Sequence, residues 1–230
     1  MTNKLALSAP VRALLALALV FLVGCVFSAD GSFYKWSTHS GMFRQAAVHG
    51  ILACGMTLVI ITAGIDLAVG SILALAAVLF SLLTIHLGWS PFGAIAAVLG
   101  TGMALGAISG GLVAGFGLQP FIVTLAMMVF ARGLAKFVSG GQKISQAVMN
   151  ADGSGYDYVE LPPIFDQIDS RLLGDAVWVV TVVFLLCAFV SWLMLSRLRL
   201  GRHVYAVGAN AEAARLSGVP VRWTLVIVYA

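Results

Sequence analysis

The acidic side chain with the least expected surroundings in this sequence is Asp66. It follows Gly64-Ile65 and interrupts residues that are otherwise apolar from about position 46 to 87. A carboxylate at membrane depth is costly unless it faces protein or water. At a helix break it could accept hydrogen bonds from the free N–H groups of the next helix and oppose the positive end of that helix dipole. We favour this capping role, and direct contact with a hydroxylated solute stays open; a proton relay is the least favoured of the three roles.

The second group of reactive side chains is the basic segment 196–222. It holds five arginines against a single acid, Glu212, and an apolar run lies on either side of it. Basic residues beside a membrane span mark the cytoplasmic side. The segment therefore orients the chain and offers a surface either to a cytosolic partner or to anionic lipid.

The sequence lacks the residue patterns that catalysis, ATP binding, metal binding or nucleic-acid binding would require. The sequence has no G-x-x-x-x-G-K-[ST] phosphate loop and no nucleophile–base–orienter set within its apolar runs, so we expect neither catalysis nor ATP binding by this chain itself. Its three cysteines and four histidines have no ligand-like spacing, which predicts no metal site and no cofactor. No basic stripe with interleaved aromatics suggests a nucleic-acid partner.

Composition defines the fold class. The 230 residues are 61% hydrophobic and 10% charged, whereas a soluble domain carries roughly 25% charged residues. Apolar runs of about eighteen residues or more indicate helical spans. We predict a single all-α, polytopic membrane domain over 1–230, with about six complete spans near 13–27, 46–62, 67–87, 92–115, 121–138 and 176–195.

The first and last apolar runs of the chain differ from complete internal spans. The first run, after Lys4 and Arg12, could be a signal peptide, but the polytopic continuation favours an uncleaved helix that enters from the cytoplasm. Residues 29–45 are expected to form a short external segment. Residues 223–230 begin a seventh span, and eight residues reach about 12 Å of a hydrocarbon core of about 30 Å. We therefore expect the chain to be truncated.

The charges of the loops test this topology. With the amino terminus inside, five spans place the acidic segment 139–175 outside, and a sixth returns segment 196–222 to the inside. Segment 139–175 carries six acidic residues, Asp152 among them, against two basic ones. The two loops thus differ in sign as the positive-inside rule requires. Arg132 and Lys136, near the outer end of the fifth span, are exceptions.

Glycine recurs every four residues in the fourth span, at Gly102, Gly106 and Gly110. This spacing removes side chains from one helix face, so that another backbone can approach closely. We expect that face to pack within the subunit, with subunit dimerisation as the alternative.

Four sequence segments, in order, resemble the permease subunits of monosaccharide (ribose-type) ABC importers. The longest is GMTLVIITAGIDLAVGS, residues 55–71, which departs from the family pattern by Ala63 for glycine and Ala68 for serine. The others are LQPFIVTL with ARG at 118–133, SGG at 139–141, and the E-A-A-x-x-x-G pattern of Glu212 to Gly218 inside GRHVYAVGANAEAARLSGV. The resemblance covers roughly residues 46–222.

The resemblance implies partners and site residues. They are a cytosolic ABC ATPase subunit that hydrolyses ATP, a second permease subunit, an external sugar-binding protein that meets 139–175, and membrane lipid. Segment 196–222 would be the loop that couples to the ATPase. Its candidate contact residues are Gly208, Asn210, Glu212, Ala213, Ala214, Arg215 and Gly218. Candidate residues of the translocation path or helix break are Gly64, Asp66, Gly70, Ser71, Gln119 and Phe121. Gln119 could bind a sugar hydroxyl or satisfy the break before Pro120.

Two alternatives stay open. An ion-coupled secondary transporter would need intramembrane ion ligands at a repeat interface, for which Asp66 is slender support. A non-transporting scaffold or permease fragment is the other. The sequence names neither the sugar nor whether two permease subunits would be identical.

Overall fold

The computed structural model describes residues 8–149 and 155–230, so Lys4 and Asp152 lie outside the described residues. The chain is mostly helical there, and its strands have two or three residues each. The longer helices are α1 (Ala9–Val26), α2 (Trp36–Ile61), α3 (Val69–Ser81) with its π-helical continuation η2 (Leu82–His86), α4 (Pro91–Phe116), α5 (Pro120–Val138) and α7 (Val179–Arg197). The shorter ones are η1 (Ala29–Tyr34), α6 (Ile164–Ile168), α8 (Arg199–Ala209), α9 (Ala211–Leu216) and α10 (Val221–Tyr229).

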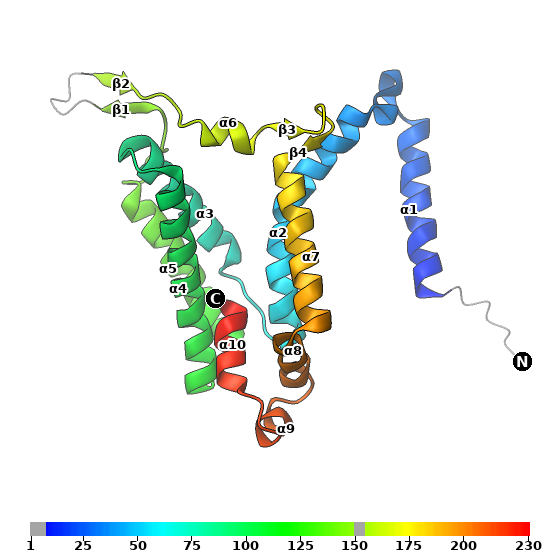
Figure 1. Ribbon diagram of the computed structural model, residues 1–230, viewed down its shortest axis with the longest axis vertical. Coiled ribbons are helices and arrows are strands. Elements are labelled where there is room, and N and C mark those ends of the chain that lie inside the picture. Colours follow the sequence, from blue (N-terminus) through cyan, green and yellow to red (C-terminus); the bar gives the residue numbers. More distant parts are fainter. Residues whose placement is uncertain (1–7, 150–154) are drawn as a thin grey trace, which may run out of the picture.

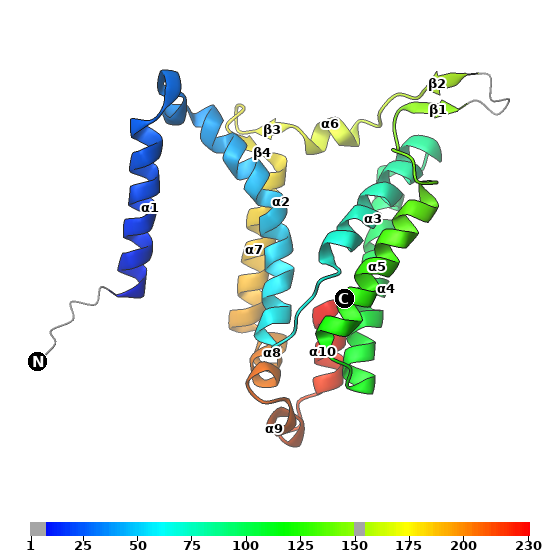
Figure 2. The ribbon, with the colours of Figure 1, turned by 180° about the vertical axis from the view of Figure 1, so that it is seen from behind.

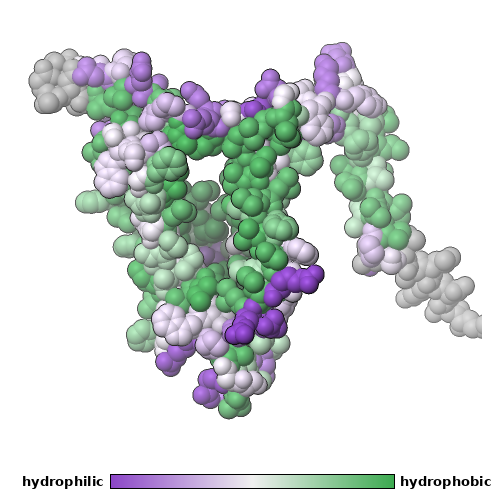
Figure 3. Space-filling model, viewed as in Figure 1, coloured by the Kyte–Doolittle hydropathy of each residue, from purple (hydrophilic) through white to green (hydrophobic). Residues whose placement is uncertain are grey.

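Five of the described helices are long and apolar enough to cross a membrane: α2, α3 with η2, α4, α5 and α7. The apolar part of α1, Pro10–Val26, is shorter than these. An apolar band covers the middle of the molecule, and polar residues gather at its two ends (Figure 3). The all-α, polytopic membrane fold predicted from the composition is thus confirmed.

The helices form two groups that are joined at both ends of the molecule (Figure 1). Helices α2 and α7 pack as a pair, whereas α3, α4 and α5 form a bundle that α10 joins through α4. Helices α8 and α9 connect the two groups at one end, and the segment from β1 to β4 crosses the other end (Figures 1 and 2). Helix α1 stands apart in both views and packs on η1.

The structure has two buried hydrophobic cores. In the bundle, Leu75 of α3 packs with Leu105 of α4 and Met127 of α5. The second core joins both groups, because Val59 of α2 and Val204 of α8 pack with Tyr229 of α10. The second core therefore lies where α8 and α10 meet the end of α2.

Helix α2 begins at Trp36, about ten residues before the predicted span. The predicted external segment 29–45 is therefore helical over 29–34 and 36–45, and its position outside the membrane stays a prediction. The polar start of α2 is anchored to segment 139–175, called the outer segment after its predicted position, because Arg44 pairs with Asp169. Next to that segment, the Ala176 carbonyl accepts from Trp36 Nε1 (2.7 Å). Hydropathy locates the apolar part of a helix and cannot show how far the helix continues outside the bilayer.

The outer segment 139–175 carries short elements. Strands β1 (Ala147–Met149) and β2 (Tyr156–Tyr158) pair antiparallel, with Val148 opposite Asp157. Strands β3 (Arg171–Leu172) and β4 (Val177–Trp178) also pair antiparallel, with Arg171 opposite Trp178. Helix α6 lies between the two hairpins.

The glycine face of α4 packs against α10. A Cβ at Gly106 would overlap the Tyr229 carbonyl, and one at Gly110 would lie 2.8 Å from the Val226 Cα. Gly102 faces Ile72 of α3 at 3.9 Å, whereas Gly111 has open space. The face thus serves helix packing within the chain, as expected.

Candidate functional site

Helix α9 begins at a side-chain cap. The Asn210 side chain accepts a hydrogen bond from the Ala213 N–H (2.9 Å), which satisfies one of the free donors of the first turn. Asn210 itself is extended (φ −164°), so the chain turns sharply between α8 and α9. The cap gives α9 a defined start at the end of the molecule opposite the outer loop (Figure 1).

The exposed side of α9 carries one ion pair. Arg215 donates to both carboxylate oxygens of Glu212, at 3.0 and 2.6 Å. The hydrogen bonds and positive charge of Arg215 lower the pKa of the Glu212 carboxyl below its usual value. Both side chains are about two-thirds exposed, so the pair contributes little to folding and is available to a partner.

The end of α9 is fixed by Ala214 and Gly218. Ala214 is buried, and its carbonyl accepts from the Val219 N–H (2.9 Å). Gly218 has a φ of +82°, a left-handed conformation that favours glycine at the end of a helix. Ala213 is exposed on the same short helix. The predicted segment therefore forms a capped helix with one buried residue and an exposed side that combines the ion pair with apolar side chains.

Helix α8 is packed backbone to backbone against the end of α2. A Cβ at Gly208 would overlap the Ile61 carbonyl, so no larger residue fits without a shift. At the other end of α8, a Cβ at Gly201 would overlap the Met194 carbonyl of α7. The loop 196–222 is thereby tied to both α2 and α7.

The chain turns immediately after Ile61. Thr62 Oγ1 donates to the Val59 carbonyl (2.8 Å), and Ala63 takes a φ of +59°. Gly64 follows, and a Cβ there would lie 2.5 Å from Tyr229 Oη. This helix break thus contacts α8 through Ile61 and α10 through Gly64.

Asp66 lies at the start of α3. Its Oδ1 accepts a hydrogen bond from the Ala68 N–H (2.7 Å). The Ala68 carbonyl in turn accepts from the Ser71 and Ile72 N–H groups, which begin the helix. Ala68 occupies the N-cap position of α3 and has no side-chain cap of its own. The Asp66 carboxylate satisfies its N–H from two residues upstream and faces the positive end of the helix.

Asp66 also lines a cavity of about 300 Å³ between α2, α3, α4 and α10. Most of the lining is aliphatic, and Tyr229 is its other polar side chain. Tyr229 is buried, and its Oη has no hydrogen-bond partner among the described residues. The cavity can therefore offer a carboxylate oxygen and a phenol to a polar solute.

The other predicted path residues lie outside this lining. Gly70 and Ser71 are in the first turn of α3, next to the lining residue Val69; Ser71 is buried, and Gly70 is exposed. Gln119 and Phe121 are exposed at the start of α5, and the Gln119 side chain makes no capping hydrogen bond there. The cavity lining thus includes Asp66 and neither Gln119 nor Phe121.

Two residues at this site were missed by sequence reasoning. Thr124 is fully buried, and its Oγ1 donates to the Ile65 carbonyl (3.2 Å) as well as to Pro120 of its own helix (2.9 Å). Tyr229 belongs to the last apolar run, where its phenol among apolar residues was the available signal.

Within residues 8–149 and 155–230, no three His, Cys, Asp or Glu side chains are grouped as metal ligands would be. The main features are the short exposed helix α9, a helix break and a cavity, which the Gly208–Ile61 and Gly64–Tyr229 contacts connect.

Comparison with known proteins agrees with this geometry. Residues 39–230 match the family described as the permease component of the branched-chain amino acid transport system. The chain is 38% identical over 218 residues to a ribose import permease protein of Escherichia coli K12, covering 93% of this chain and 63% of that protein.

Two further relatives are similar in extent. A fructose import permease protein of Rhizobium meliloti is 35% identical over 225 residues, which cover 96% of this chain and 60% of that protein. A D-allose transport system permease protein of Escherichia coli K12 is 34% identical over 218 residues, 91% of this chain and 61% of that protein.

The chain thus spans about three fifths of the length of these curated relatives. No solved structure matches it significantly. The family match covers most of the described helices, from α2 to α10. The chain belongs to the family of branched-chain amino acid transport system permease components.

Proposed function

We propose that this chain is part of the permease of an ABC importer for a monosaccharide. The family supplies the permease role, and the relatives named for ribose, fructose and D-allose support a sugar as the cargo. In this proposal a separate cytosolic ATPase subunit hydrolyses the ATP, and the chain itself is not an enzyme. It lies in the bacterial inner membrane with its amino terminus in the cytoplasm.

Helix α9 is proposed as the ATPase-docking element. It presents the exposed Glu212–Arg215 pair, while Ala214 anchors it to the protein. Asn210 and Gly218 fix its two ends, so the helix is already in the shape that a groove would accept. A short, pre-ordered helix loses less entropy on docking than a flexible loop would.

The contact of Gly208 with the Ile61 carbonyl is the observation that carries the proposal. It joins α8, next to the docking helix, directly to the last turn of α2. The helix break with Gly64 and Asp66 follows that turn, and Asp66 lines the cavity. A displacement of α9 would therefore reach the cavity through two contacts.

The cavity beside Asp66 is proposed as part of the sugar path. A sugar hydroxyl could donate to the Asp66 carboxylate and accept from the Tyr229 phenol, the cavity's polar side chains. Gly70 and Ser71, in the first turn of α3, would shift with Asp66. A second permease subunit would complete the path, and an external binding protein would meet the acidic segment 139–175.

The proposal is tested by co-purification of the cytosolic ATPase with the detergent-solubilised protein. Glu212→Lys and Gly218→Trp should abolish co-purification, because they reverse a docking charge and block a left-handed turn. The matched controls are Glu160→Lys and Gly174→Trp in the outer segment, where Gly174 also has a positive φ (66°) and open space. Retention of the ATPase by the loop variants would contradict the assignment.

Uptake measurements separate importer from ion-coupled transporter. Proteoliposomes that contain the permease, the co-purified ATPase and the binding protein should accumulate labelled ribose, fructose or allose. This uptake should require ATP on the side of the membrane where the ATPase is bound. Uptake driven by an ion gradient without ATP would contradict the proposal.

A further inference from the structure

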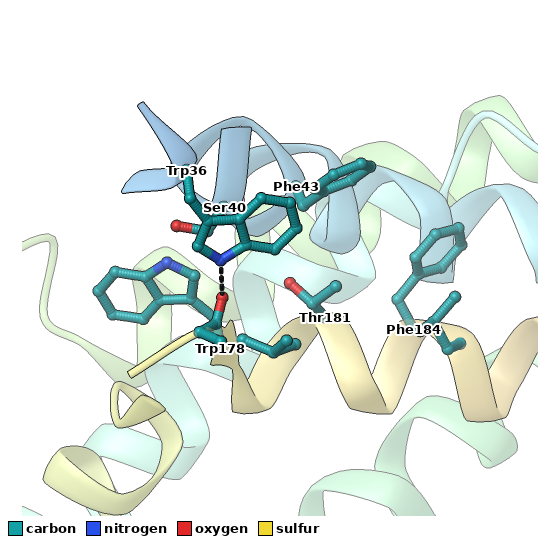
Figure 4. Close-up of a pocket in the computed structure, with 9 residues that line it drawn as sticks. Trp36, Ser40, Phe43, Trp178, Thr181 and Phe184 are labelled. Atoms are coloured by element: carbon teal, nitrogen blue, oxygen red, sulfur yellow. Dashed lines mark hydrogen bonds between the residues drawn. The ribbon is translucent and has the colours of Figure 1, made fainter. Parts of the chain in front are cut away.

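A groove of about 300 Å³ lies at the outer-loop end of α2 and α7. Trp36, Ser40 and Phe43 of α2 form one wall. The other wall, formed by 176–178 and the first turns of α7, includes Trp178, Thr181 and Phe184 (Figure 4). Its lining is aromatic and aliphatic, and it is distinct from the cavity beside Asp66.

Two polar atoms in this apolar lining lack a protein partner. Thr181 is 8% exposed, and neither its Oγ1 nor the Trp178 Nε1 makes a hydrogen bond among the described residues. By contrast, the Trp36 Nε1–H donates a hydrogen bond to the Ala176 carbonyl (Figure 4). Buried donors without partners are costly, so these two donors indicate an acceptor on whatever fills the groove.

Positive charge gathers at the Trp178 end of the groove. The guanidinium groups of Arg44 and Arg171 lie over the Trp178 ring, at 4.2 and 4.3 Å from its centroid. Arg44 pairs with Asp169, whereas Arg171 has no ion pair among the described residues. Asp169 thus pairs with one of the two cations, and the Arg171 guanidinium, without an ion pair among the described residues, is suited to an anion.

The groove also opens toward the apolar band. Leu185, which lines it, is 58% exposed on the outer side of α7. The neighbouring α7 surface is apolar over the length of the helix, with only 6% of its span buried. An occupant must therefore be apolar at one end, carry an acceptor near Thr181 and be anionic near Arg171.

We propose that this groove binds one anionic phosphoglyceride of the membrane leaflet on the outer-loop side. One acyl chain lies between Phe43, Phe184 and Leu185, the ester carbonyl accepts from Thr181 and Trp178, and the phosphate contacts Arg171. A sugar does not suit this groove, because most of its hydroxyls would lack partners against an aromatic lining. The site is independent of the proposed transport function.

The test is native mass spectrometry of the delipidated protein titrated with phosphatidylglycerol. Leu185→Trp fills the groove from the lipid side, and its matched control is Leu186→Trp, since Leu186 is equally exposed (60%) but does not line the groove. We expect one bound lipid in the parent and in Leu186→Trp. Leu185→Trp should weaken binding by about tenfold or more.

Two further variants test the polar contacts. Arg171→Gln should weaken phosphatidylglycerol binding by about tenfold and leave a neutral diacylglycerol unaffected, whereas Lys143→Gln in the same outer segment should change neither. Thr181→Val keeps the shape of the side chain and removes the hydroxyl. It should weaken binding of the ester-linked lipid and leave binding of its ether-linked analogue unchanged.

Three results would overturn the inference. The first is equal lipid binding by Leu185→Trp and Leu186→Trp. The second is an equal loss of binding affinity for phosphatidylglycerol and for diacylglycerol in a folded Arg171→Gln variant. The third is a two-copy assembly that Leu185→Trp disrupts, because the groove would then be an interface between copies of the chain.

Discussion

Between α2 and α3 the backbone passes through Ala63, whose φ of +59° lies in the left-handed region. An L-residue with a Cβ is disfavoured there by about 1–2 kcal/mol. The sequence resemblance already marks this position, since glycine is usual in the family segment that Ala63 interrupts. The structure supplies the physical reason for that preference.

Ala63→Gly should stabilise the protein. The relief of the left-handed strain, less the entropy that glycine adds to the unfolded chain, predicts a gain of about 0.5–1 kcal/mol. The measurement is thermal unfolding in detergent. Ala53→Gly, an exposed position inside α2, is the matched control and should cost about 1 kcal/mol. Destabilisation by both substitutions would show that Ala63 is not strained.

The Glu212–Arg215 pair predicts how docking depends on pH. Arg215 lowers the pKa of the Glu212 carboxyl, so the charged pair is fully formed above the ordinary carboxyl value of about 4.3 and is lost as the pH falls through the lowered pKa. The pair stays charged from about pH 8 to pH 6, so its contribution to docking should not change the yield of co-purified ATPase over that range. Glu212→Gln should be weaker throughout that range. Weakening of the parent alone between these values would contradict the assignment.

Residue contacts were predicted only in part. The hydrogen bond that Asp66 accepts from Ala68 follows from a local pattern, a carboxylate two residues before the N-cap position of a helix. Thr124 and Tyr229 were missed because their partners, Ile65 and Gly64, are distant in the sequence. Such contacts depend on how α5 and α10 pack, and no local periodicity encodes that packing.

At the scale of elements, the four-residue glycine spacing of α4 corresponds to a close crossing with α10. Gly106 and Gly110 are buried against the α10 backbone, and Gly111 on the adjacent stripe is open. Spacing alone predicts that a helix approaches this face. It does not identify which helix approaches, because α10 comes from the far end of the chain.

Gly106→Ala and Gly111→Ala should have opposite effects. A Cβ at Gly106 overlaps the Tyr229 carbonyl, so α10 must shift, at a cost of about 1–3 kcal/mol. Gly111→Ala meets nothing within 4 Å and should stabilise α4 by up to about 1 kcal/mol through helix propensity. Unfolding midpoints in detergent measure both. Equal effects would mean that α10 does not pack on this face.

Element boundaries were the weaker part of the prediction. The start of α2 at Trp36 lies in polar sequence, and the Trp36–Ala176 and Arg44–Asp169 contacts that hold it come from the outer segment. By contrast, the break at 62–68 was located to within a few residues, because glycine and a carboxylate interrupt apolar sequence there.

For the whole molecule, the acidic outer segment and the basic loop lie at opposite ends (Figure 1). Their opposite charges predicted this separation, because the sign of loop charge is set by membrane orientation. The separate position of α1 was not predicted, since an apolar run does not show what it packs against.

Cysteine labelling tests the orientation. In a form without the native Cys25, Cys54 and Cys187, Glu160→Cys should react with a membrane-impermeant maleimide in intact cells. Arg215→Cys should react only in inside-out vesicles, because α9 is proposed to face the cytosol. Labelling of position 215 from outside would reverse the topology.

The close approach of Gly208 to Ile61 has a mechanical consequence. Where side chains separate two helices, part of an applied displacement is absorbed as rotamers change. A joint of main chain against main chain has no such compliant layer, and packed interiors are stiff. A small rotation of α8 should therefore be transmitted to the last turn of α2 almost without loss. The stiffness of this α8–α2 contact depends on the absence of one methyl group, the Cβ that Gly208 lacks.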